Sequence, residues 1–130
     1  MIFSLLVQET PVGRESSRAA YRFAQGCIAA GHTVFRVFFF RDGAHHGAAL
    51  NIVQGPEEDL PRSWQEFAIA HQIDLVVCVS SALRRGIIDE KEASRRGLSG
   101  ANLRAGFEIS GMGQLVEACI RSDRVLSFGG

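Results

Sequence analysis

The chain has 130 residues, a length that suits one domain with a single core. It has 14 basic and 14 acidic residues, so its net charge is close to zero. The overall charge therefore gives no reason to expect nucleic-acid binding. No stretch approaches the roughly 20 apolar residues of a membrane span, and the apolar N-terminus lacks the basic segment of a signal peptide. We therefore expect one cytoplasmic domain over residues 1–130, with no membrane contact.

Strand-like and helix-like segments alternate along the chain. Runs rich in branched and aromatic residues predict strands, and apolar residues at helical spacing predict helices. In chain order, the sequence predicts strand 2–8, helix 15–30, strand 33–40, loop 41–49, helix 62–72, strand 74–79, helical turn 80–86, helix 89–96, strand 107–109, helix 111–122 and strand 124–128. This alternation is typical of an α/β fold, a single three-layer α/β/α domain with a mainly parallel five-stranded sheet.

Cys78 is the residue whose position most favours chemistry. Sites in parallel sheets form beyond the carboxyl ends of the strands, where segments 8–14, 41–49 and 78–86 are expected to gather. Cys78 ends a predicted strand directly before a helical turn, and the free N–H groups of such a turn favour a nearby anion. A thiolate there would be a nucleophile and a sulfur carrier, whereas a buried thiol would be neither. Position alone leaves both roles open.

Four residues that follow Cys78 are candidates for stabilising its anion. Ser80 and Ser81 begin the predicted helical turn, and Arg84 and Arg85 follow one turn further on. A nearby positive charge favours the thiolate form of a cysteine. The helical twist can bring one of the two arginines to face Cys78, and the alternative for the pair is a solvated helix end.

The other cysteines and the paired histidines offer weaker candidates. Cys27 and Cys119 lie on the apolar faces of predicted helices, where we expect them to pack as small hydrophobic residues. His45 and His46 could approach Cys78 from the neighbouring loop, but the sequence places no acid to orient them, so we expect them to be exposed. None of these residues shows the ligand spacing of known metal sites. We therefore predict free thiols, no metal and no cofactor.

Four stretches of the chain resemble the TusD/DsrE family of sulfur-relay subunits, in the same order and spacing and nearly from end to end. They are Val-Phe-Phe-Phe-Arg-Asp-Gly (37–43), Val-Cys-Val-Ser-Ser-Ala-Leu-Arg-Arg-Gly-Ile-Ile-Asp-Glu (77–90), Phe-Glu-Ile-Ser-Gly-Met-Gly-Gln-Leu-Val-Glu-Ala (107–118) and Asp-Arg-Val-Leu (123–126). The resemblance implies that Cys78 carries sulfur as a persulfide. It also implies no catalytic role for the other two cysteines.

The resemblance further implies a place in a complex. In the tRNA-modifying branch, TusB-like and TusC-like subunits would join this chain in a heterohexamer. That assembly would take sulfur from a TusA-like donor and pass it to a TusE-like acceptor for 2-thiolation of the tRNA wobble uridine, without binding tRNA directly. The alternative is a DsrE-type subunit of a sulfur-oxidation DsrEFH complex. The segments 83–90 and 101–107 favour the TusD branch.

Two further alternatives come from other functional classes. In a non-catalytic scaffold subunit, Cys78 would only be packed. A nucleotide-binding α/β domain would rest on the fold alone, because the helix start at Gly111-Met112-Gly113 lacks the third glycine of the dinucleotide motif, where residue 116 is Val.

Overall fold

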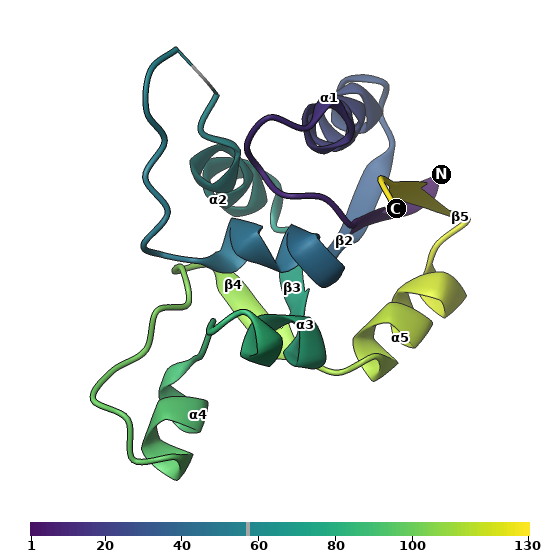
Figure 1. Ribbon diagram of the computed structural model, residues 1–130. Helices are drawn as coiled ribbons and strands as arrows, with labels where there is room; N and C mark the ends of the chain where they lie inside the picture. Colours follow the sequence, from purple (N-terminus) through teal and green to yellow (C-terminus); the bar gives the residue numbers. More distant parts are fainter. Residues whose placement is uncertain (57) are drawn as a thin grey trace.

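The computed structural model describes residues 1–56 and 58–130, which form one five-stranded parallel sheet with helices on both faces (Figure 1). The strands are β1 (Ile2–Val7), β2 (Thr33–Phe39), β3 (Asp74–Cys78), β4 (Phe107–Ser110) and β5 (Arg124–Phe128). The helices are α1 (Glu15–Ala29), the 3-10 helix η1 (Arg41–Gly47), α2 (Leu60–His71), α3 (Val79–Arg84), α4 (Glu90–Arg95) and α5 (Gly113–Arg121). The predicted α/β class and the five strands are confirmed.

The strand order is β4-β3-β2-β1-β5, and every neighbouring pair is parallel. All five carboxyl ends therefore meet at one edge of the sheet. Residues 41–49, expected to form a loop, instead begin with η1. The Gly/Ala/His composition of this segment has no apolar period that would have indicated a helix.

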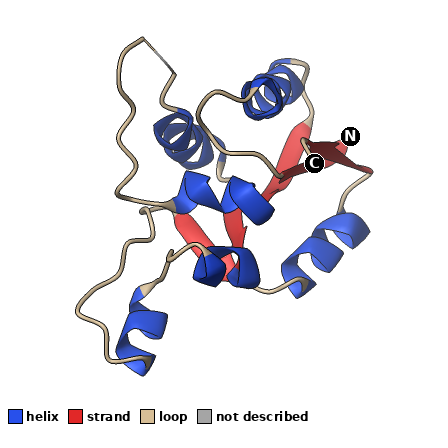
Figure 2. Cartoon of the chain, in the orientation of Figure 1, coloured by secondary structure: helices blue, strands red, loops and turns tan. Residues whose placement is uncertain are grey.

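Helices lie on both faces of the sheet (Figure 2), and the hydrophobic core beneath them is larger on one face than on the other. Helices α1 and α2 cover one face, where Trp64 and Phe39 are fully buried in the main core. Helix α5 covers the opposite face over a small cluster of Phe38, Val76 and Cys78. Among the described residues, no helix is long and apolar enough to cross a membrane.

A buried arginine tethers α5 to the sheet. Arg36 of β2 donates to the Gln114 carbonyl at 2.9 Å, to Glu117 at 2.8 Å and to Asp74 at 3.0 Å. Of the α5 residues, Ala118 is buried and Leu115 is partly buried. Helix α5 is thus held to the sheet in good part by polar contacts.

Candidate functional site

The candidate site lies at the carboxyl edge of the sheet, around the end of β3. Cys78 is the last residue of β3 and directly precedes α3, which begins at Val79, one residue before the predicted helical turn 80–86. The register pairs Cys78 with Ser110 on β4. On the other side it pairs Val77 with Phe39, so Phe40 lies beside Cys78. In the sheet, Cys78 therefore has Ser110 as its neighbour on one strand and Phe40 as its neighbour on the other.

The surroundings of the Cys78 thiol are apolar. Its exposed fraction is 2 %, and it belongs to the small cluster with Phe38 and Val76. Leu6, Phe40 and Leu115 pack against that cluster. Helix α3 has six residues, and the Cys78 side chain makes no capping hydrogen bond to it within the described chain. A reagent therefore has to pass this covering layer before it meets the sulfur.

The four residues predicted to stabilise a Cys78 anion fall into two pairs. Ser81 is buried and accepts a hydrogen bond from the Arg41 N–H at 2.8 Å. Arg85 donates to Asp42 at 2.9 and 3.0 Å and to the Ser81 carbonyl at 3.1 Å. These contacts join α3 to η1. Their proposed role towards the anion stays a prediction.

Ser80 and Arg84 form the second pair and are exposed. Arg84 is the last residue of α3, at the opposite end of that helix from Cys78. Arg84 makes no ion pair among the described residues. Their predicted role likewise stays a prediction.

The paired histidines lie in different environments. His46 is fully buried, and its Nδ1–H donates to the Gly43 carbonyl at 2.9 Å, while its ring packs 4.9 Å from that of Phe39. Burial lowers the pKa of His46 to about 4 from its ordinary 6.5. The expectation that both histidines are exposed is wrong for His46, because the ring completes the core beneath η1. His45 is half-buried.

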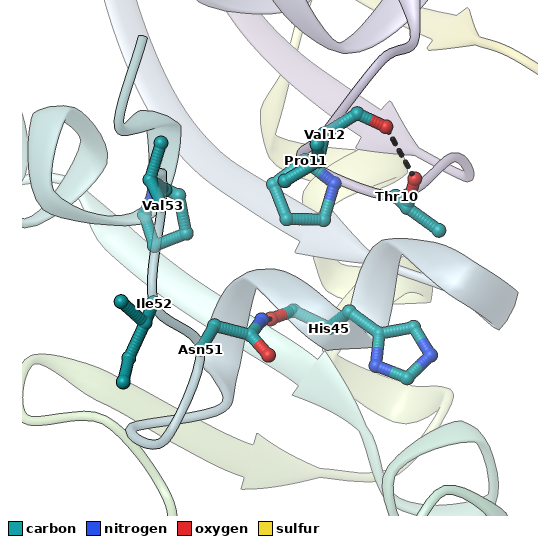
Figure 3. Close-up of a pocket in the computed structure, with 8 residues that line it drawn as sticks. Thr10, Pro11, Val12, His45, Asn51, Ile52 and Val53 are labelled. Atoms are coloured by element: carbon teal, nitrogen blue, oxygen red, sulfur yellow. Dashed lines mark hydrogen bonds between the residues drawn. The ribbon is translucent and has the colours of Figure 1, made fainter. Parts of the chain in front are cut away.

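His45 lines a cleft of about 190 Å³ that includes residues of two predicted site segments (Figure 3). The lining residues are Thr10, Pro11, Val12, His45, Asn51, Ile52, Val53 and Pro61. Figure 3 shows the Thr10–Val12 loop on one side of the cleft and Asn51 to Val53 on the other. Segments 8–14 and 41–49 thus meet here as expected, whereas residues 78–86 do not line this cleft.

The remaining two cysteines differ from each other. Cys27 is buried as predicted, and burial raises the pKa of its thiol. Cys119 is exposed, so the expectation that it packs is wrong. Helix α5 turns Leu115 and Ala118 towards the sheet and leaves Val116 and Ile120 outside, 57 % and 78 % exposed.

No group of three His, Cys, Asp or Glu side chains suited to a metal ion occurs within residues 1–56 and 58–130.

Sequence reasoning did not identify three residues that lie near Cys78. They are Phe40, Arg41 and Ser110, which the register and the α3 contacts bring to the cysteine or its neighbours. Each of them lies at or just after the end of a strand. That position also identified Cys78 and could have indicated these residues.

The family model described as DsrE/DsrF-like matches residues 1–128. This chain belongs to the DsrE/DsrF-like family. The match covers the whole described sheet, including the strand that ends at Cys78. The predicted family is therefore confirmed.

Two relatives agree with this membership, and a solved structure shares the fold. The chain is 43 % identical over 129 residues to the DsrE protein of Allochromatium vinosum, covering 99 % of both chains. It is 44 % identical over 128 residues to the sulfurtransferase TusD homolog of Vibrio parahaemolyticus, covering 98 % of each. The crystal structure of the YchN protein from E. coli shares the fold, with a TM-score of 0.68 at 22 % identity, over 98 % of this chain and 100 % of that one.

Proposed function

We propose that this chain is a sulfurtransferase that carries sulfur as a persulfide on Cys78. The observation that carries the proposal is the nearly full-length similarity to a relative named as a sulfurtransferase, at 44 % identity. The position of Cys78 supports it, since it is the cysteine at the carboxyl edge of the sheet among the described residues. Cys27 and Cys119 lie within helices away from that edge.

The proposed transfer consists of two thiolate displacements. The Cys78 thiolate attacks the outer sulfur of a donor persulfide, the donor S–S bond breaks, and the donor leaves as a thiolate. An acceptor thiolate then attacks the outer sulfur of the Cys78 persulfide and regenerates the Cys78 thiolate. Each step forms one S–S bond and breaks another, so no external oxidant or reductant is consumed.

The cellular setting of the transfer is part of the same proposal. The donor would be a TusA-like protein and the acceptor a TusE-like protein, in a cytoplasmic heterohexamer with TusB-like and TusC-like subunits. The product would serve 2-thiolation of the tRNA wobble uridine. Exposed Met112, directly before α5, and exposed Val116 and Ile120 on the outer face of α5 recur every fourth residue, which supports association with another subunit. The DsrE-type role in sulfur oxidation is the alternative, because the two named relatives are almost equally similar.

A non-catalytic scaffold is the second candidate function, and the burial of Cys78 favours it. A thiol that is 2 % exposed and packed among apolar side chains is typical of a structural cysteine. In this role the chain would support a sulfur carrier located on another subunit.

Mass spectrometry of the intact protein separates the two candidates. We expect the protein, alone or in the assembly that co-purifies with it, to gain the mass of one sulfur atom from glutathione persulfide. The Cys27→Ser and Cys119→Ser variants should gain the same mass, and Cys78→Ser should gain none. A gain that persists in folded Cys78→Ser would contradict the carrier role, and no gain in any variant would favour the scaffold.

A genetic test separates the two branches of the proposed pathway. Deletion of the chain should remove 2-thiolation from the wobble uridine of the affected tRNAs, as measured by nucleoside analysis. Intact tRNA thiolation together with a defect in sulfur oxidation would instead support the DsrE-type role.

A further inference from the structure

The backbone of Arg41 adopts a conformation that side chains rarely take. Its φ is 53°, in the left-handed region. Gln72, the other non-glycine residue of the described chain with positive φ, ends α2 in the left-handed conformation that is common at helix termini. Arg41 instead joins β2 to the start of η1, where no α-helix ends. Such strained residues cluster at functional sites, so a role for its side chain is the first explanation to test.

Contacts from α3 hold this conformation in place. The buried Ser81 hydroxyl accepts a hydrogen bond from the Arg41 N–H at 2.8 Å. Arg85 fixes the next residue, Asp42, through two hydrogen bonds to its carboxylate. Both Ser81 and Arg85 belong to the turn that follows Cys78. Arg41 is thereby positioned relative to the element that presents the cysteine.

The side chain of Arg41 lies over the ring that borders Cys78. Its guanidinium carbon is 5.5 Å from the centre of the Phe40 ring. Phe40 lies beside Cys78 in the sheet register and packs against the cluster that contains the thiol. Because Arg41 is exposed, this cation faces solvent at the border of the cysteine's covering layer.

The charge of Arg41 is not offset by an ion pair within the described residues, whereas that of Arg85 is offset by Asp42. Arg84 is also exposed and without an ion pair in that part of the chain, but it lies at the far end of α3 from Cys78. A guanidinium stays charged throughout the physiological pH range. Arg41 therefore presents an available positive charge near the cysteine.

We propose that Arg41 draws anionic sulfur compounds to Cys78. The inference rests on the proposed persulfide transfer, because a donor persulfide and the thiolate that departs are both anions. The strained, anchored backbone keeps the guanidinium beside Phe40 instead of letting it swing away from the sheet edge. Arg41 is in this sense a specificity-determining residue, which favours an anionic donor over a neutral one of similar size.

Alkylation of Cys78 by two reagents that differ in charge tests the inference directly. Iodoacetate is an anion and iodoacetamide is neutral, so the ratio of their rates at Cys78, measured by peptide mass spectrometry on the folded protein, reports local charge. We expect Arg41→Gln to lower the iodoacetate-to-iodoacetamide ratio by about three- to fivefold at low salt. Arg41→Lys should restore most of the ratio. Arg121→Gln is the matched control that should leave it unchanged, because it removes an exposed guanidinium that also lies over a phenylalanine ring, that of Phe35, but in the last turn of α5.

A second variant distinguishes the loss of the charge from an effect on folding. Arg41→Gly removes the charge and relieves the left-handed strain, so its ratio should fall as in Arg41→Gln while its thermal stability is kept. An unchanged ratio in both variants would overturn the inference, and so would a Cys78 that neither reagent labels. Failure of the proposed function is a separate result. It would be seen as absent sulfur loading of Cys78 in the protein that keeps Arg41.

Discussion

Replacement of His46 should flatten the pH dependence of the protein's stability. The neutral ring donates through Nδ1–H to the Gly43 carbonyl, and its Nε2 is buried without a hydrogen-bond partner among the described residues. A proton on Nε2 would place a charge in the core beneath η1, next to the Phe39 ring. We expect His46→Asn to remove this titration, since an amide can still donate to Gly43 but is not protonated.

The magnitude follows from the lowered pKa of His46, which burial moves from 6.5 to about 4. Above pH 6.5 the histidine is neutral in both the folded and the unfolded protein, so it adds no pH dependence. Between pH 6.5 and 4 the unfolded chain binds a proton that the folded protein does not, and stability is lost as the pH falls. At about 1.4 kcal/mol per pH unit, the complete loss is about 3 kcal/mol, of which about 2 kcal/mol appears between about pH 7 and about pH 5.

Urea unfolding at a series of pH values measures this effect. The wild-type free energy of unfolding should drop by about 2 kcal/mol more than that of His46→Asn between about pH 7 and about pH 5. His45→Asn is the matched control, because it also removes one histidine but from the half-buried wall of the cleft. It should keep the wild-type slope. Equal slopes for wild type and His46→Asn would refute the reasoning.

Two further substitutions test the contacts around the site. Gly43→Ala should lower the free energy of unfolding by at least about 2 kcal/mol, because the new Cβ would overlap the Val7 carbonyl, a backbone group that cannot rotate away. Glu117→Gln should raise the rate at which iodoacetamide labels Cys78 by about fivefold. It weakens the charged hydrogen bond from Arg36 that holds α5 over the cluster.

Each substitution has a control elsewhere in the chain. Gly26→Ala, at an exposed position in the last turn of α1 with open space around the new Cβ, should instead stabilise the protein by about 0.5–1 kcal/mol. Glu66→Gln removes an exposed carboxylate from α2, paired with Arg62, and should leave labelling of Cys78 unchanged. If Gly43→Ala unfolded like wild type, the packing at η1 would be wrongly described. If Glu117→Gln left labelling unchanged, α5 would not limit access to the thiol.

The strands were predictable because buried parallel strands are continuous apolar runs. The stretch at 33–40 predicted a strand that the structure places at Thr33–Phe39. The end of β3 at Cys78, and with it the candidate site, followed from the same pattern. The order of the strands was not predicted, since it depends on pairings between segments that are distant in sequence.

Cys119 was wrongly predicted to pack because α5 carries apolar residues on two faces. Leu115 and Ala118 define one face, and Val116 and Ile120 define the other. Spacing alone does not say which face meets the sheet. The buried Arg36 provides the missing information, because Glu117 and the Gln114 carbonyl have to face it. That requirement rotates Val116 and Ile120 outward.

The proposed role of Arg41 did not follow from its place at a strand end, for a related reason. Its left-handed backbone is held by Ser81, which lies 40 residues further along the chain. The sequence places Arg84 and Arg85 nearer to Cys78, but distance along the chain is a poor guide to distance in space. Asp42 engages Arg85, and helical rise carries Arg84 away from the cysteine.

The unequal cores on the two faces of the sheet reconcile a buried thiol with a proposed reaction at that thiol. Exposing the α1 and α2 face would uncover Trp64 and Phe39, whose burial stabilises the main core. Displacing α5 would uncover a small cluster and break hydrogen bonds from Arg36 that water can replace. A folded protein opens locally at the element that buries the fewest apolar contacts. The layer that opens at the lower free-energy cost is therefore the one that covers Cys78.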